Sequence, residues 1–221
     1  MQQAVCRASV ISLSQARPAR LRRYTQRPFS LRETIMVKVL GISGSLRKAS
    51  YNSAALKACA ALMPEGMELS IATIGDLPMY NQDVFDAGIP QPAKRFYDEI
   101  AAADGVLIAT PEYNFSMPPL LKNAIDWVSK MPSQPFNNKP IAVFSASQGP
   151  LGGARVQYDV RKILVQLWGL VLPRPEVFIG VAQTKFDKEG KLTDEATRKY
   201  LTELCGGFKT WIERMRAAKP K

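Results

Sequence analysis

Residues 44–52 form a short polar stretch after an apolar run and contain several groups that could bind an anion. Ser45 and Ser50 offer hydroxyls, Asn52 an amide and Arg47 a guanidinium. An alanine-rich helical pattern starts at Asn52, so the stretch also offers the unpaired N–H groups and the positive dipole end of a helix N-terminus. These groups together predict a phosphate-binding loop. A strand-to-helix turn of small polar residues without a ligand is the alternative.

The same loop lacks the sequence signatures of two common nucleotide sites. It has neither the Gly-Lys-Ser/Thr of a Walker loop nor the Gly-x-Gly-x-x-Gly pattern of a dinucleotide-binding fold. Sites for nucleoside triphosphates and for dinucleotides are therefore less favoured. A phosphomonoester is the expected ligand.

Two later loops also follow apolar runs and could complete a site. Residues 111–119 place Tyr113, Asn114 and Phe115 after a continuous apolar run, which suits the binding of a planar ring. Residues 146–153 contain three glycines, which would allow the backbone to approach a ligand closely. Each loop also has a simpler interpretation, a turn stiffened by proline in the first case and an ordinary glycine turn in the second.

The composition limits the chemistry that the chain itself can perform. The 221 residues include no histidine, which excludes Ser-His-Asp and Cys-His hydrolases, histidine-ligated zinc sites and histidine proton shuttles. The three cysteines, Cys6, Cys59 and Cys205, suggest neither a zinc site nor a disulfide framework and favour a reducing compartment. We expect Cys59 in the core. Redox chemistry would therefore need a bound cofactor.

Length and hydropathy indicate one globular domain. Hydrophobic residues make up 46% of the chain and charged residues 22%. The longest apolar runs are far shorter than the 18 or so residues of a membrane span. We therefore expect a soluble protein whose folded domain covers residues 36–221.

Residues 1–35 differ from the rest of the chain in charge. They hold seven arginines, no lysine and one acidic residue, Glu33, and so supply +6 of the formal net charge of +11. We expect a disordered, non-catalytic extension, whether a transit-type leader, a disordered tail or a misassigned start before Met36. N-terminal sequencing of the native protein would distinguish these origins. The moderately basic remainder could attract anionic ligands without binding nucleic acid.

Apolar periodicity predicts strands that alternate with helices. The expected strands cover residues 37–42, 67–74 (near a sheet edge), 105–110, 140–145 and 176–180; the expected helices cover 52–63, 92–103, 118–130, 154–168 and 194–216, the last capped by Thr193, and a long loop covers 75–91. Five such repeats imply a parallel sheet covered by helices on both faces. In the strand order 2-1-3-4-5, the three loops described above would meet at one rim.

Three motifs, in order, resemble those of the NADPH-dependent FMN reductase family, most closely its chromate/quinone reductase branch. They are Gly-Ser-Leu-Arg-Lys-Ala-Ser-Tyr-Asn at 44–52, Pro-Glu-Tyr-Asn at 111–114 and Ser-x-Gly-x-x-Gly-Gly-Ala-Arg at 147–155. The resemblance covers about residues 37–215. It implies a flavodoxin-like, three-layer α/β/α sandwich with a five-stranded parallel sheet, strand order 2-1-3-4-5, and tightly bound FMN.

The resemblance also assigns roles to single residues. The implied FMN-binding residues are Ser45, Leu46, Arg47, Ser50, Tyr51 and Asn52 at the phosphate; Pro111, Glu112, Tyr113 and Asn114 beside the isoalloxazine; and Ser147, Gly149 and Gly152 at its other edge. The expected substrate-side residues are Tyr80, Asn81, Tyr113 and Phe115. No catalytic side chain and no metal ligand are expected, because the flavin carries the chemistry.

The implied activity is a ping-pong transfer of electrons from NADPH or NADH through bound FMN to a small-molecule acceptor. The acceptor would be a quinone, a free flavin, an azo compound or an oxyanion such as chromate. A non-enzymatic flavodoxin-type electron carrier is the alternative, although such carriers are usually acidic. A nucleic-acid-associated protein that uses residues 1–35 is a second alternative.

The resemblance further implies a homodimer or homotetramer. Arg155, Tyr158 and Glu176 would then join an interface network, and ordinary helix-surface polarity is their simpler role. We expect no membrane association and a cytoplasmic location. Organellar targeting by residues 1–35 stays open as an alternative.

Overall fold

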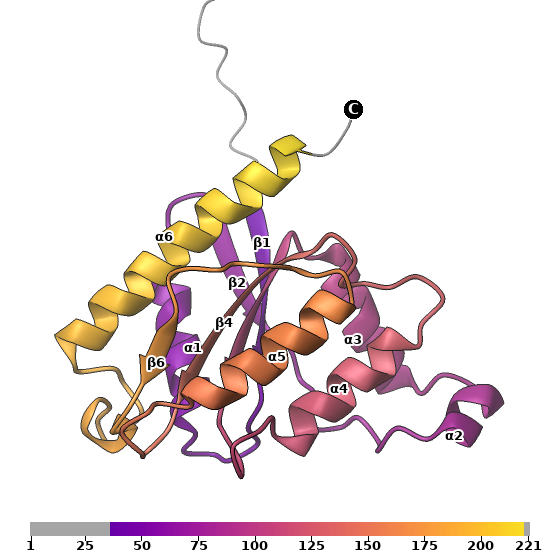
Figure 1. Ribbon diagram of the computed structural model, residues 1–221, viewed down its shortest axis with the longest axis horizontal. Coiled ribbons are helices and arrows are strands. Elements are labelled where there is room, and N and C mark those ends of the chain that lie inside the picture. Colours follow the sequence, from indigo (N-terminus) through magenta and orange to yellow (C-terminus); the bar gives the residue numbers. More distant parts are fainter. Residues whose placement is uncertain (1–35, 219–221) are drawn as a thin grey trace, which may run out of the picture. The chain divides into compact units, whose positions relative to one another are not determined.

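In the described part of the computed structural model, six strand segments, all paired in parallel, build one sheet (Figure 1). The structure describes residues 36–218, so the expectations for residues 1–35 lie outside it. The strands are β1 (Val37–Ser43), β2 (Met67–Ile71), β3 (Gly105–Thr110), β4 (Pro140–Ala146), β5 (Leu170–Val171) and β6 (Val177–Ile179). Their order is β2-β1-β3-β4-β5, with β6 also on β4. The predicted flavodoxin-like order is confirmed, and β2 lies at the edge as expected.

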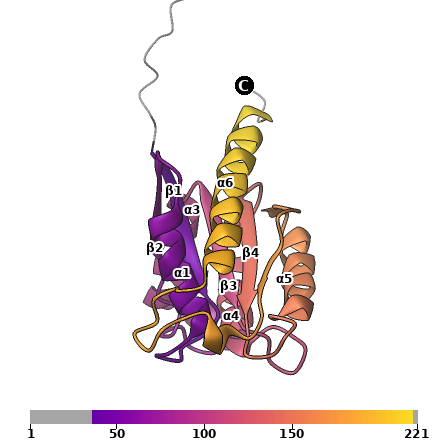
Figure 2. The ribbon, with the colours of Figure 1, turned by 90° about the vertical axis from the view of Figure 1, so that its left-hand side faces the viewer.

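Helices cover both faces of the sheet, as Figures 1 and 2 show. They are α1 (Tyr51–Leu62), α2 (Gln82–Ala87), α3 (Gln91–Ala102), α4 (Pro119–Ser129), α5 (Ala154–Gln166) and α6 (Glu195–Ala218), with a short 3₁₀ turn at Ala182–Thr184. Helices α1 and α6 pack on one face, and α3, α4 and α5 pack on the other. Cys59 is buried between α1 and α6, as expected for a core residue. A hydrogen bond with the Cys205 thiol, together with burial, raises the pKa of Cys59.

The register of the central strands places the starts of the loops after β1, β3 and β4 at the same edge of the sheet. Every residue of β3 and β4 is buried, which explains their continuous apolar sequences. In the register, Ser43 of β1 lies opposite Ala109 of β3, and Thr110 of β3 lies opposite Ser145 of β4. The loops that follow these three strands therefore start side by side.

Two regions differ from the sequence prediction. The long loop at 75–91 contains α2, whose first turn is capped when the Asn81 side chain accepts a hydrogen bond from the Asp83 N–H (2.8 Å). The predicted fifth strand at 176–180 corresponds to β6, which pairs with the end of β4, and a further short strand that was not predicted, β5, pairs with the start of β4. Pro173 and Pro175 lie between these two strands and have no N–H to donate to the sheet, which explains why the strands are separate.

The cap of α6 also differs from the prediction. Thr193 was the expected cap, but its hydroxyl donates to the Lys185 carbonyl. Asp194 is the capping residue, because its Oδ1 accepts hydrogen bonds from the Thr197 N–H (2.8 Å) and hydroxyl (2.6 Å). The hydrogen bond from the Thr197 hydroxyl is the main reason that the pKa of Asp194 falls from 3.8 to about 2.

Asp194→Ala should lower the free energy of unfolding near pH 7 by about 1 kcal/mol, the usual cost of losing a helix cap. Because folding lowers the pKa of Asp194, its contribution is complete above pH 3.8 and declines as the pH falls towards 2. Urea unfolding at pH 7 and pH 3 measures both effects. Thr193→Ala is the control and should change the stability less; the opposite ranking would contradict the assignment.

Candidate functional site

The loops after β1, β3 and β4 enclose a cavity of about 230 Å³ at the carboxyl edge of the sheet. Nine of the predicted cofactor residues line it: Ser45, Arg47, Ser50, Tyr51, Asn52, Pro111, Glu112, Tyr113 and Ser147. Ala146 and Gln148 also line it. Sequence reasoning did not single out these two, although both are neighbours of Ser147. The three polar loops therefore converge as the strand order predicts.

The first turn of α1 presents unpaired donors to this cavity. Ser50 caps the helix, with its hydroxyl oxygen 3.3 Å from the Ser53 N–H. The N–H groups of Tyr51 and Asn52 donate to no other group in the described part of the chain. Arg47 is exposed, and its guanidinium lies 5.3 Å from the centre of the Tyr51 ring. Free N–H groups, a positive dipole end and a guanidinium form a suitable site for a phosphate.

Asn52 joins the first loop to the third. Its side-chain N–H donates to the Ala146 carbonyl, and its side-chain oxygen accepts from the Ala146 N–H, both at 2.9 Å. Only 3% of Asn52 is exposed. The amide was expected to hold a phosphate, whereas here both of its polar atoms bind the end of β4. Its backbone N–H is the group left for an anion.

The loop after β3 is a tight hairpin. Tyr113 and Ser116 exchange two backbone hydrogen bonds of 3.0 Å, and Asn114 and Phe115 between them adopt left-handed φ angles of 51° and 66°. The Ser116 hydroxyl donates to the Asp159 carboxylate of α5 at 2.7 Å, which lowers the pKa of Asp159. The hairpin is therefore held against α5.

Four predicted cofactor residues do not line the cavity. Leu46 is exposed and lies beside Gly75, and Asn114 lies in the hairpin turn. The Gly149 carbonyl accepts from the Gly152 N–H and is directed towards the β6 turn. Gly152 is buried so tightly that a Cβ there would lie 2.7 Å from the Gly180 nitrogen. Gly152 thus serves the packing of the third loop, whereas Gly149 is exposed and contributes its carbonyl to the hydrogen bonds of that loop.

The predicted substrate-side residues Tyr80, Asn81 and Phe115 also lie outside the cavity wall. The Tyr80 ring packs edge-on against Trp127, with 5.1 Å between ring centres, and its hydroxyl donates to the Gln82 side chain. Asn81 caps α2. Phe115 is exposed beneath the Arg155 guanidinium, which lies 4.2 Å from its ring centre. Tyr113 is the one predicted substrate-side residue on the wall.

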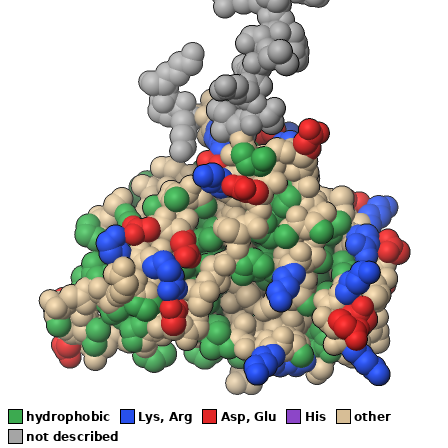
Figure 3. All heavy atoms as spheres, turned by 180° about the vertical axis from the view of Figure 1, so that it is seen from behind, with side chains coloured by type: hydrophobic (Ala, Val, Ile, Leu, Met, Phe, Trp, Pro, Cys, Tyr) green, Lys and Arg blue, Asp and Glu red, His purple; other side chains and the backbone are tan. Residues whose placement is uncertain are grey.

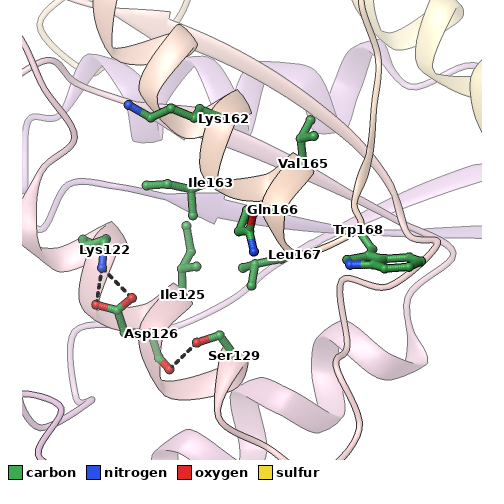
Figure 4. A pocket seen from close by; sticks show the side chains of 10 residues that line it. All are labelled: Lys122, Ile125, Asp126, Ser129, Lys162, Ile163, Val165, Gln166, Leu167 and Trp168. Atoms are coloured by element: carbon green, nitrogen blue, oxygen red, sulfur yellow. Dashed lines mark hydrogen bonds and ion pairs between the residues drawn. The ribbon is translucent and has the colours of Figure 1, made fainter.

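A larger hollow of about 550 Å³ lies between α4 and α5 (Figure 4). Ile125, Ile163 and Leu167 give it an apolar floor, and Lys122 and Asp126 pair with each other at its rim. No predicted site residue lines it, and it lies on the helical flank of the sheet. The smaller cavity at the carboxyl edge is therefore the candidate site. Within residues 36–218, no three Cys, Asp or Glu side chains cluster closely enough to hold a metal ion.

Comparisons with known proteins give one consistent result. Residues 37–184 match the family model of NADPH-dependent FMN reductases. An NAD(P)H-dependent FMN reductase of Pseudomonas aeruginosa is 49% identical over 180 residues, which cover 81% of this chain and 97% of the relative. A quinone reductase of Escherichia coli is 40% identical over 183 residues, with 81% and 97% covered. The flavoenzyme NAD(P)H:(acceptor) oxidoreductase FerB from Paracoccus denitrificans superposes with a TM-score of 0.75 at 36% identity, covering 81% of this chain and 98% of FerB.

Proposed function

Because the chain belongs to the NADPH-dependent FMN reductase family, we propose that it passes electrons from NAD(P)H to small-molecule acceptors at the 230 Å³ cavity. The chain is an oxidoreductase whose cofactor is FMN and whose co-substrate is NAD(P)H. Bound FMN supplies the hydride and electron transfer that amino-acid side chains lack. The observation that carries the proposal is the start of α1, where two free N–H groups lie beside Arg47.

We assign the phosphate of FMN to this start of α1. The hydroxyls of Ser45 and Ser50 and the guanidinium of Arg47 line the same cavity and would add hydrogen bonds to those of the backbone. The cavity is smaller than the 300–1,000 Å³ of typical ligand pockets. The ring would therefore lie partly outside the cavity, at its open side, with Tyr113 and Ser147 on the adjoining walls.

The side chains that line the cavity are better suited to binding and orienting FMN than to transferring protons. The chain has no histidine, and Glu112, the one carboxylate on the wall among residues 36–218, accepts hydrogen bonds from the start of α5. We infer that NAD(P)H and the acceptor use the open side of the site in turn, which is a ping-pong mechanism. Quinones are the acceptors that we favour because relatives carry the name quinone reductase; chromate, free flavins and azo compounds rest on the resemblance of the motifs.

The alternative function, a flavodoxin-type electron carrier, would exchange electrons with protein partners and would not be reduced by NAD(P)H. An exposed surface of mixed charge, as on the face in Figure 3, gives no reason to favour a protein redox partner.

No helix within residues 36–218 is long and apolar enough to cross a membrane. We further propose a cytoplasmic location, which fractionation of cells that make the full chain would test.

Purified protein should show the absorption bands of bound flavin, and anaerobic NADPH or NADH should bleach them rapidly. An acceptor such as a benzoquinone should then restore the oxidised spectrum. A chain that neither retains FMN nor binds added FMN would overturn the proposal. Bound FMN that NAD(P)H fails to reduce would support the electron carrier instead.

Arg47→Ala should weaken FMN binding by about ten- to a hundredfold, because a charge-assisted hydrogen bond contributes about 1.5–3 kcal/mol. Titration of the apoprotein with FMN measures the effect. Lys48→Ala is a matched control, since Lys48 is an exposed neighbour of equal charge that does not line the cavity. Equal affinities of the two variants would remove Arg47 from the phosphate site.

We also propose that the protein is a homodimer or homotetramer. Of the three residues expected at an interface, Arg155 is paired with Glu112 and Glu176 with Arg161, whereas Tyr158 is 60% exposed. Val165, two turns further along α5, is 63% exposed, so the outer face of α5 offers apolar area to a second copy. Sedimentation equilibrium should give at least twice the mass of the chain. A monomer at all concentrations would reject the assembly.

A further inference from the structure

The N-terminus of α5 cannot be capped by its own residues. The capping position is Gly153, which has a left-handed φ of 80° and no side chain. A Cβ at Gly153 would lie 2.9 Å from the Ser145 Cβ, so a capping Ser, Thr or Asp does not fit without rearrangement. The first N–H groups of a helix need an acceptor from elsewhere when the helix supplies none. That acceptor comes from a distant part of the chain.

Glu112 supplies it from the loop after β3. Its Oε2 accepts hydrogen bonds from the N–H groups of Arg155 (2.9 Å) and Val156 (3.1 Å). Its Oε1 lies 3.3 Å from the Arg155 guanidinium, and only 12% of the Glu112 side chain is exposed. The carboxylate thus meets both the positive end of the helix dipole and a cation.

This cap connects two walls of the cavity. Glu112 lies between Pro111 and Tyr113, which line the cavity, while α5 follows directly from the loop that contains Ser147. The bond from Ser116 to Asp159 ties the same hairpin to α5 a second time. Moving the hairpin away from α5 would therefore leave the Arg155 and Val156 N–H groups without their acceptor.

We propose that Glu112 is a positioning residue for FMN. It sets the distance between the two cavity walls beside the flavin ring, and its negative charge affects the electrostatic potential at the ring. This inference rests on the proposed function. In it, Glu112 acts through α5 and Arg155, and its side chain does not contact the flavin directly. Reduction places negative charge on the ring, and nearby positive groups stabilise that charge. Glu112 offsets the positive end of α5 and Arg155, so it holds the reduction potential of the cofactor below the value that these groups alone would give.

Two substitutions separate spacing from charge. Glu112→Gln keeps an acceptor for the helix N–H groups and removes the charge; it should leave the FMN dissociation constant within about threefold and raise the midpoint potential. Glu112→Ala removes the cap as well; it should weaken FMN binding by about tenfold or more and speed hydrogen exchange at the Arg155 and Val156 amides of the apoprotein.

Asp194→Asn is the matched control, because Asp194 is also a carboxylate that caps a helix and pairs with a cation, Lys185, yet it does not line the cavity. It should leave both FMN affinity and midpoint potential unchanged. If Glu112→Ala does not fold, the potential of Glu112→Gln decides alone. Suppose that the wild-type protein binds FMN. If the midpoint potential of Glu112→Gln then equals that of the wild type, or shifts no more than that of Asp194→Asn, this inference is wrong and the proposed function stands. Wild-type protein without FMN affinity would overturn the proposed function and this inference together.

Discussion

The buried pairing of Asn52 with Ala146 is the interaction on which the site depends most. Its two hydrogen bonds of 2.9 Å satisfy four polar atoms in the interior. Separating α1 from β4 would leave them unpaired, at a cost of about 1–3 kcal/mol for each unsatisfied group. The first turn of α1, with its free N–H groups, is therefore held at the end of β4. The start of α1 and the loop at 146–153 are consequently joined to each other by buried hydrogen bonds.

The two charged side chains of the cavity differ in whether they have a partner. Glu112 is matched by the start of α5 and by Arg155, whereas no acidic side chain of the described residues pairs with Arg47. The positive field at the start of α1 thus stays available to an anion, and the carboxylate on the opposite wall does not cancel it. The cavity thus combines a cation that is unpaired among the described residues with a paired carboxylate and needs no histidine for this arrangement.

The central strands and the convergence of the three loops could be predicted from the sequence because β3 and β4 are buried on both faces and so have continuous apolar sequences. Helix α2 was missed because six residues are too few to show periodicity. Strand β5 was missed because its two residues are too few to show alternation. The bond from Glu112 to α5 joins residues 43 positions apart, so local patterns do not reveal it.

The contact between Gly152 and Gly180 restricts how this site can change over evolutionary time. A Cβ at Gly152 would meet the Gly180 backbone at 2.7 Å, and a Cβ at Gly180 would meet the Pro150 carbonyl oxygen at 2.3 Å. A single substitution at either position must displace backbone, so neither change opens a gradual mutational path. New acceptor specificity is then more accessible through the hairpin, where Tyr113, Asn114 and Phe115 are exposed and can vary while Gly152 and Gly180 stay unchanged.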